Sequence, residues 1–388
     1  MAIPLKYNLR NLRARFVTTL VTALSISLTV AIFITLMALA NGLRMAFVST
    51  GHPRNLIVLR QNAGTETNST ITPEAFQVLK YLPGVARNEK GEPLASAETI
   101  VLINLPRVNT TERSNVLIRG LSFSGLALHP QVKLVEGRWF EPGSREIVVS
   151  RQISRRFQKT RMGDTLRFGK GDWKVVGIFE AAGTAYDSEI WCDGNQVRDD
   201  YNRHLYSSVY LQVEDSTLLE PLSKRIHDDQ RLQLDAKGEL QYYAEQTGAG
   251  KVIQVYGMFI SIVMAIGSGF AAMNAMYGAV VNRFREIGIL RVLGFSKMSI
   301  LLSFAIESLI LALIGGGIGC LLALPINGIS TGTTNFQTFS EITFTFRVTP
   351  ELLLWGMIFS GLIGLWSGLF PAIRAARKPI LEALRAVV

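Results

Sequence analysis

Cysteine and histidine are scarce in this sequence, which contains two cysteines and four histidines among 388 residues. Cys192 and Cys320 lie far apart, the second within an apolar run, so we expect neither a disulfide framework nor a C-x-x-C metal site. The motifs H-E-x-x-H and H-x-H, which place metal ligands at defined spacings, do not occur. We therefore expect no metal site and no catalytic residues.

Charged residues are also few, at 18% of the chain, whereas hydrophobic residues reach 48% and the mean hydropathy is +0.26. This balance is too apolar for a soluble two-domain protein and too charged for one wholly embedded in lipid. A protein that lies partly in a bilayer and partly in water is predicted. A net charge of +10 could indicate a nucleic-acid partner. The positions of the basic residues along the chain decide whether it does.

Four stretches contain the roughly 20 apolar residues that a helix needs to cross a bilayer. They run from Phe16 to about Leu39, from Val252 to Val281, from Ser299 to about Ile326, and from about Leu352 to Ile373. Basic residues precede the first stretch, as in a signal peptide. Its apolar run of about 22 residues exceeds the 7–15 of a signal sequence, so we interpret it as an uncleaved helix.

Basic residues gather beside these stretches on one side. They are Lys6, Arg10, Arg13 and Arg15; Arg283, Arg285, Arg291 and Lys297; and Arg374, Arg377, Lys378 and Arg385. Between the third and fourth stretches, residues 328–349 contain a single basic residue, Arg347. Positive charge marks the cytoplasmic side, so both termini and residues 282–298 are predicted inside and residues 49–245 outside. The basic excess reflects topology, and no nucleic-acid partner is expected.

Small residues recur at every fourth position of each span, where they share a helix face and allow close helix packing. The positions are Ala23, Ser27, Ala31 and Thr35; Gly267, Ala271, Ala275 and Ala279; Ala312, Gly316 and Cys320; and Gly356, Ser360, Gly364, Gly368 and Ala372. Five in a row on the fourth span predict a packing ridge. On the other spans, the general abundance of small residues in membrane helices explains the pattern equally well.

Glu307 lies about two turns into the third span, where an ionisable residue is costly and often functional. Two interpretations stay open. Glu307 has a structural role, reaching headgroups, water or Arg291, or it takes part in coupling to a partner.

The long segment between the first two spans predicts an α+β domain outside the membrane. Strands are expected at residues 115–122, 145–150 and 207–214, a hairpin at 163–180, and helices at 73–81, 151–158 and 216–228. Residues 186–206 combine acids, a cysteine and a histidine, but lack ligand spacing. We interpret them as a solvated strand-and-loop segment.

The predicted boundaries follow from these patterns. They are a cytoplasmic amphipathic segment 1–15, the first span and its stalk 16–48, the outer domain 49–245, a stalk and second span 246–281, a cytoplasmic helix 282–298, the third span 299–327, a short external loop 328–349, the fourth span 350–373 and a cytoplasmic tail 374–388. The fold class is therefore a membrane protein with four transmembrane helices and a large α+β domain inserted after the first.

The loop NRFREIGILRVLGFSKMSI (282–300) is too apolar for a plain turn between helices. Its apolar residues, Phe284, Ile287, Ile289, Leu290, Val292 and Leu293, spread around most of a helical wheel, which requires burial on more than one side. We expect the bilayer and span ends to cover one side and a cytosolic partner the other, with Arg283, Arg285, Glu286 and Arg291 at the rim. Gly294 and Ser296 suit helix caps, predicting a short rigid helix.

This segment, together with Glu307 and the ending PAIRAARKPILEALRAVV, resembles the FtsX-like permeases, the membrane subunits of MacB-type (type VII) ABC transporters. The segments GLSFSG, EGRWFEPG and WKVVGIFE resemble the outer domain of that family more weakly. The layout of one span, a large outer domain and three further spans also agrees with the family.

The resemblance implies a non-catalytic subunit that conveys the movement of a cytosolic ATPase to the outer domain, which is called mechanotransmission. Its coupling residues would be Arg283, Phe284, Arg285, Glu286, Ile287, Leu290, Arg291, Leu293 and Gly294. ATP and Mg²⁺ would bind the ATPase, in agreement with the lack of G-x4-G-K-[ST] here. The other implied partners are a second permease subunit in a homodimer, membrane lipids and a periplasmic adaptor protein.

The resemblance to this family implies that the protein lies in a bacterial inner membrane. It leaves two functions open. The first is export or extraction of a substrate from the membrane or periplasm. The alternative is a non-transporting regulator that activates an extracytoplasmic cell-wall hydrolase. A membrane-anchored enzyme is a third hypothesis, for which the sequence offers no nucleophile and base.

Overall fold

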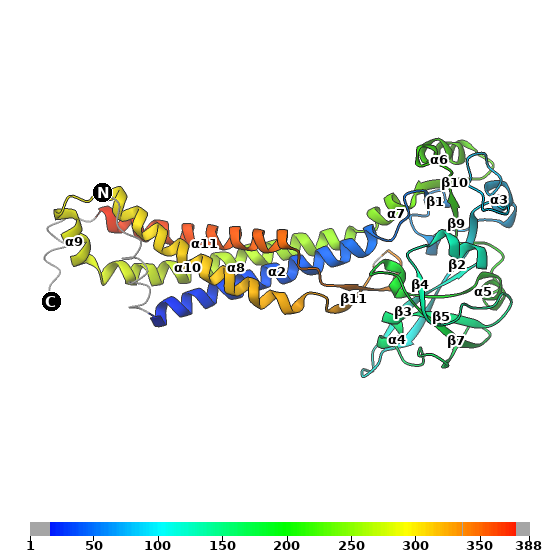
Figure 1. Ribbon diagram of the computed structural model, residues 1–388, viewed down its shortest axis with the longest axis horizontal. Helices are drawn as coiled ribbons and strands as arrows, with labels where there is room; N and C mark the ends of the chain where they lie inside the picture. The colour runs from blue at the N-terminus through cyan, green and yellow to red at the C-terminus, as the bar shows by residue number, and fades with distance from the viewer. Residues whose placement is uncertain (1–15, 336, 378–388) are drawn as a thin grey trace. The chain divides into compact units, whose positions relative to one another are not determined.

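The computed structural model describes residues 16–335 and 337–377, which form two compact units (Figure 1). The membrane unit contains residues up to Asn41, Lys251–Ile329 and residues from Phe346 onward. The outer unit contains Gly42–Gly250 and Ser330–Thr345. The predicted amphipathic segment 1–15 and most of the predicted tail lie outside the described residues.

Within the described residues, four helices are long and apolar enough to cross a membrane, in agreement with the four predicted spans. They are α2 (Phe16–Val48), α8 (Gly248–Val281), α10 (Lys297–Ala323) and α11 (Pro350–Arg377). A helix of 33 residues such as α2 is about 50 Å long, against about 30 Å for a bilayer core. It therefore continues past the apolar layer, as expected for a stalk. The predicted stalk and second span, 246–281, correspond to α8, and the short helix α7 (Glu239–Glu245) precedes it.

The predicted ridge on α11 packs against α10. A Cβ atom on Gly364 would meet Ala312 and Ser308, and one on Gly368 would meet Ser308. Gly316 of α10 faces Ser360, whose hydroxyl donates to the carbonyl of Ala312.

Glycines also bring α10 and α11 close to α2. Gly315 and Gly319 of α10 lie against the carbonyls of Ala23 and Ser27, and Gly356 of α11 packs on Ile34. Lipid supplies no hydrophobic drive for helices to associate, so membrane helices rely on close packing. Glycine allows it because it has no side chain to hold the backbones apart.

Of the small-residue row predicted on α8, Ala279 is buried, but the first two positions do not pack within this chain. Gly267 and Ala271 are exposed, and a Cβ on Gly267 would meet nothing within 4 Å. The packed face instead contains Gly269, against Trp366, and Ala272. Ala275 is half-buried. Small residues at a spacing of four occur in more than one register here, so their spacing does not identify the buried face.

The outer unit is built on a ten-stranded sheet in the order β10-β1-β9-β2-β3-β8-β5-β7-β4, with β6 paired to β7. The strands are β1 (Asn55–Arg60), β2 (Ala95–Pro106), β3 (Arg113–Leu121), β4 (Lys133–Gly137), β5 (Glu146–Ser150), β6 (Thr165–Phe168), β7 (Gly171–Glu180), β8 (Glu189–Asp193), β9 (Ser208–Gln212) and β10 (Leu234–Gly238). Both parallel and antiparallel pairs occur.

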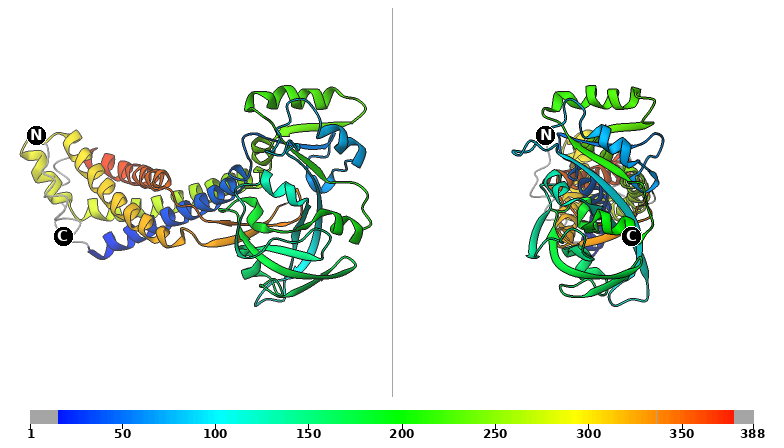
Figure 2. Two further views of the ribbon diagram at one scale, coloured as in Figure 1. Left: turned by 45° about the vertical axis from the view of Figure 1, so that its right-hand side comes forward. Right: turned by 90° about the vertical axis from the view of Figure 1, so that its right-hand side faces the viewer.

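Short helices cover the sheet and divide it into two cores. The helices are α3 (Pro73–Leu79), α4 (Arg151–Arg156), α5 (Gly194–Asp200), α6 (Leu219–Asp228) and α7, with 3-10 turns η1 (Glu66–Asn68), η2 (Phe123–Leu128), η3 (Ala185–Ser188) and η4 (Ser216–Leu218). One core joins α3 and α6 to β1, β9 and β10, and Figure 2 shows α6 beside β10. The other core joins α4 and α5 to β2, β3, β5, β7 and β8. The long strand β2 pairs with both β9 and β3 and so connects the two.

The predicted α+β class and the elements predicted near β3, β5, β9, α3, α4 and α6 are confirmed. The hairpin expected at 163–180 forms between β6 and β7, and Gly169 has the positive φ of +59° that its turn requires. Four strands of this sheet, β1, β2, β4 and β10, were not predicted, and β8 falls in the segment interpreted as strand and loop.

The interpretation of residues 186–206 as solvated is wrong for their first half. β8 is buried along its whole length, because it pairs with β3 on one side and β5 on the other. Its alternating acids and apolar residues resemble a half-exposed strand in sequence. Glu189, however, pairs with the buried Arg119, and Asp193 accepts from the backbone N–H groups of Gly143 and Asn195.

The segment predicted as a short external loop, 328–349, contains two paired strands. The short turn η5 (Leu324–Ile326) follows α10, and then β11 (Ser330–Thr334) and β12 (Glu341–Thr345) form an antiparallel hairpin that belongs to the outer unit. No strand was predicted here, although β-branched threonines suit strands.

Neighbouring glycines of α10 provide a matched test of this packing. Gly316→Val should destabilise the purified chain by roughly 1–3 kcal/mol, because the added methyls overlap Ser360 and Met357. Gly317→Val is the control, since a Cβ at Gly317 meets nothing within 4 Å. The measurement is thermal unfolding in detergent. Equal melting temperatures for the two variants would contradict the packing.

Candidate functional sites

The helix α9 (Phe284–Val292) links α8 to α10 (Figure 1). One cap ends α9, and a second cap begins α10. Gly294 has a φ of +92°, the N–H of Phe295 donates to the Leu290 carbonyl over 3.1 Å, and the N–H of Gly294 donates to Arg291 over 3.2 Å. These bonds form a Schellman motif. The Ser296 hydroxyl then accepts from the Ser299 N–H over 3.1 Å and caps α10. The predicted caps at Gly294 and Ser296 are confirmed, and α9 is a short helix with a defined C-terminal end.

A buried ion pair fixes the start of this segment. Arg283 Nη1 lies 2.9 Å from Glu307 Oε2, and the two residues are 7% and 4% exposed. Glu307 therefore has a structural partner in Arg283, and the expected rim position of Arg283 is wrong. Each charge lowers the cost of burying the other, which explains how an acid is accommodated within α10.

One face of α9 packs on the neighbouring helices. Ile287 is buried among Met276 and Val280 of α8 and Ile300 and Phe304 of α10. The prediction that Ile287 contacts a partner is therefore wrong, because the chain itself covers this side chain. Its packing holds α9 against the ends of α8 and α10.

The opposite face of α9 is apolar and exposed. Ile289, Val292 and Leu293 are 46%, 64% and 65% exposed, and their spacing of three and four places them on one side of the helix. Two of the three, Ile289 and Val292, were absent from the predicted coupling set. Of the remaining predicted positions, the exposed ones are Arg285, Glu286 and Gly294, and the half-buried ones are Phe284, Leu290 and Arg291.

A second cluster of charge lies inside the outer unit, around Arg119 of β3. This guanidinium is 1% exposed. It donates to both oxygens of Glu189 over 2.8 and 2.9 Å, to both oxygens of Glu66 over 2.9 and 3.1 Å, and to Glu98 over 2.7 Å. Paired, planar contacts of this kind are the strong form of an arginine–carboxylate bond. Sequence reasoning missed the cluster, although an arginine inside the apolar strand NVLIRGL was a signal for it.

His129 extends the cluster through Glu98, its Nε2 lying 3.0 Å from a Glu98 oxygen. Burial disfavours the charged imidazole, but the Glu98 carboxylate outweighs this effect and raises the pKa of His129 above its ordinary value. Burial alone would raise the pKa of Glu98, yet His129 and Arg119 hold it below its ordinary value. The two groups therefore stabilise each other as an ion pair.

Burial raises the pKa of Glu189 in spite of Arg119, and it also raises the pKa of Glu239. Glu239 accepts from the Tyr186 hydroxyl and the Asn55 amide over 2.8 and 2.9 Å. These carboxyls are bonded to neutral donors and to one cation. Among residues 16–335 and 337–377, no group of three or more His, Cys, Asp and Glu side chains is arranged to hold a metal.

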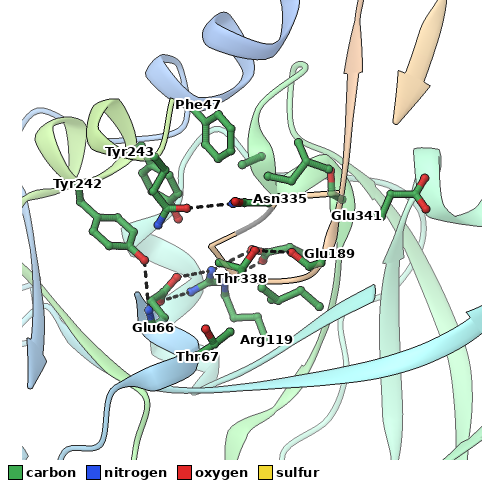
Figure 3. Close-up of a pocket in the computed structure, with 16 residues that line it drawn as sticks. Phe47, Glu66, Thr67, Arg119, Glu189, Tyr242, Tyr243, Asn335, Thr338 and Glu341 are labelled. Carbon is green, nitrogen blue, oxygen red and sulfur yellow. Dashed lines mark hydrogen bonds and ion pairs between the residues drawn. The ribbon is translucent and has the colours of Figure 1, made fainter. Parts of the chain in front are cut away.

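A cavity of about 30 Å³ adjoins this cluster (Figure 3). In Figure 3, Arg119 and Glu66 point toward one another, and the Tyr242 hydroxyl reaches Glu66, whose N–H it accepts over 3.2 Å. Residues of the β11–β12 hairpin, including Thr338 and Glu341, form another wall. The volume suits about one water molecule. The arrangement is that of a structural ionic core rather than a substrate pocket.

Comparison with known families gives two matches that together cover most of the chain. Residues 19–229, more than half of the sequence, match the MacB-like periplasmic core domain, and residues 258–380 match the FtsX-like permease C-terminal.

The chain also resembles curated relatives. It is 26% identical over 348 residues to the uncharacterized ABC transporter permease YknZ of Bacillus subtilis, covering 84% of this chain and 82% of that protein. It is 26% identical over 307 residues to the macrolide export ATP-binding/permease protein MacB of Pasteurella multocida, covering 74% of this chain but 46% of the relative.

Two solved structures are similar to part of the chain. One is the extracellular domain of YknZ from Gram-positive bacteria, with 16% identity and a TM-score of 0.35 over 47% of this chain and 99% of that one. The other is the periplasmic region of MacB from Actinobacillus actinomycetemcomitans, with 11% identity and a TM-score of 0.37 over 49% and 91%.

The buried pair in the membrane unit can be tested by a double-mutant cycle. Arg283→Ala and Glu307→Gln should each destabilise the chain by about 3–5 kcal/mol, because each leaves a buried charge or polar partner behind. The double variant should lose clearly less than the sum of both. Thermal unfolding in detergent measures this, with Arg285→Ala, at an exposed site, as control. Strict additivity would contradict a direct pair.

The His129–Glu98 pair predicts a pH dependence in the outer unit. A raised folded-state pKa means that protonated His129 stabilises the fold fully below its unfolded-state pKa of about 6.5 and loses this effect as the pH rises through the folded-state pKa. The stability difference between wild type and His129→Gln should therefore shrink as the pH rises. Pulse proteolysis of the full chain in urea measures it. His204→Gln, at an exposed position, should differ little from wild type at any pH.

Proposed function

Because the chain belongs to the MacB-like and FtsX-like family of ABC transporter permeases, we propose that it couples ATP hydrolysis by a separate cytosolic ATPase to movement of its outer unit. Such movement would drive export or extraction of a substrate from the membrane or periplasm. ATP and Mg²⁺ would bind the ATPase, and this chain would perform no catalysis.

The exposed face of α9 is the observation that carries this proposal. Ile289, Val292 and Leu293 present apolar surface on a helix whose other face is anchored by Ile287 and whose start is held by Arg283 and Glu307. A helix fixed in this way moves together with α8 and α10 when a partner displaces it. A flexible loop would absorb the same displacement. We propose that the ATPase binds this face.

The charge distribution supports an orientation for the complex. Arg283, Arg285, Arg291 and Lys297 surround α9, and positive charge favours the cytoplasmic side. We propose that α9 and both termini face the cytoplasm in a bacterial inner membrane, with the outer unit on the other side.

The proposed complex contains two permease subunits. The exposed side of α8 carries apolar residues such as Phe259, Ile266 and Phe270 beside the small residues Gly267 and Ala271. Small and apolar residues together suit either lipid or a second helix. We propose that a second copy of this chain packs there, with lipid around the dimer.

Substitutions on α9 test the ATPase contact. Val292→Asp and Leu293→Asp should abolish co-purification with the ATPase, because each places a charge in a desolvated apolar contact. Val292→Thr, which keeps the size of the side chain, should weaken it less. Val78→Asp, at an exposed apolar position of the outer unit, is the control for the substitution itself. Normal co-purification of both α9 variants would overturn the proposed docking face.

A further inference from the structure

The β11–β12 hairpin is a continuous ribbon that starts at the ends of two membrane helices. Its strands pair from Ser330 with Thr345 up to Thr334 with Glu341. Below them, the Phe346 N–H donates to the Ile329 carbonyl and the Gly328 N–H to the Phe346 carbonyl, each over 3.0 Å. The two legs are therefore bonded to each other nearly to η5 and α11. A paired ribbon resists bending more than two separate loops would.

Two arginines of the outer unit hold the far end of this ribbon. The Glu341 side chain is fully buried and lies 2.7 Å from Arg107 Nη2, and it also pairs with Arg156. Arg107 follows β2, and Arg156 ends α4, so the carboxylate joins two separate elements of the outer unit. A buried carboxylate that loses both cations is strongly unfavourable, which makes the contact hard to separate.

Neutral hydrogen bonds and apolar burial add to this contact. The Thr343 N–H donates to the Ser188 hydroxyl over 2.7 Å, and the Asn335 amide donates to Gln246 over 3.3 Å. Ile342 and Phe344 are 6% and 2% exposed. The hairpin is therefore bound along its length rather than at one point.

The hairpin also closes the cavity beside Arg119 (Figure 3). Thr338, Glu341 and Ile342 line that cavity opposite Glu66 and Arg119. Withdrawal of the hairpin would open the buried ionic core to water. The outer unit and the hairpin thus form one folded body, although the hairpin is reached in sequence only through α10 and α11.

We propose that the hairpin 330–345 is a second mechanical link, in addition to α2 and α8, through which displacement of α10 and α11 reaches the outer unit. Glu341, Arg107 and Arg156 are the positioning residues that hold it. This proposal rests on the proposed function in one respect, because the ATPase would be the source of the movement. The binding of the hairpin to the rest of the outer unit does not depend on the ATPase.

Hydrogen exchange on the full chain in lipid nanodiscs, without ATPase, tests the seating. In wild type, the amides of β12 should be protected like those of β3 and β8. Glu341→Ala should speed exchange in β11 and β12 at least about tenfold and leave β3 and β8 unchanged. Glu112→Ala is the matched control, since Glu112 is an exposed partner of Arg107 at 3.9 Å. Loop-like exchange of β12 in wild type would overturn the proposal.

The same measurement with the ATPase tests transmission. Glu341→Ala should still bind the ATPase and hydrolyse ATP, but its outer unit should show less than half of the wild-type, ATP-dependent change in exchange. An undiminished response in this variant would overturn the link. If wild type binds no ATPase, the proposed function fails instead, and the exchange rates of the permease alone decide whether the hairpin is held.

Discussion

The pairing of buried arginines and glutamates is the constraint on which both units depend. A guanidinium removed from water is tolerated only where carboxylates satisfy it, and breaking such a pair from one side costs several kcal/mol. Arg119 meets Glu66, Glu98 and Glu189 inside the outer unit. Arg283 meets Glu307 in the membrane unit. In both places the partners come from segments distant in sequence, so these segments cannot separate without leaving a charge unmatched.

The same chemistry recurs where the hairpin joins the outer unit. Glu341 pairs with Arg107 and Arg156, and the cavity that the hairpin closes is walled by the Arg119 cluster. Ionic contacts are directional and lose strength steeply when water enters, so they favour discrete arrangements over gradual sliding. The proposed transmission of movement would benefit from this property. The parts of the chain can be carried as rigid bodies, whereas apolar contacts alone would let them slip.

Close backbone packing gives the membrane unit its own rigidity. Gly316, Gly364 and Gly368 bring α10 and α11 together, and Gly315 and Gly319 bring α10 against α2. The capped helix α9 is attached to this bundle through Ile287 and the Arg283–Glu307 pair. Displacement of α9 is therefore expected to move helices rather than deform a loop, and this links its exposed apolar face to the function of an ABC transporter permease.

The sequence by itself determined the features that depend on local pattern. These are the four spans, the α+β class, the caps at Gly294 and Ser296, the ridge on α11 and the family. Tertiary structure decided which side of a helix is covered and which charges meet. Ile287 is buried, Gly267 and Ala271 are exposed, and Glu307 pairs with Arg283. Residues 328–349 looked like a loop because their partners, Arg107 and Arg156, lie about 200 residues earlier in the chain. Periodicity and composition report on neighbours along a chain, whereas ion pairs and buried faces depend on contacts that only the folded chain creates.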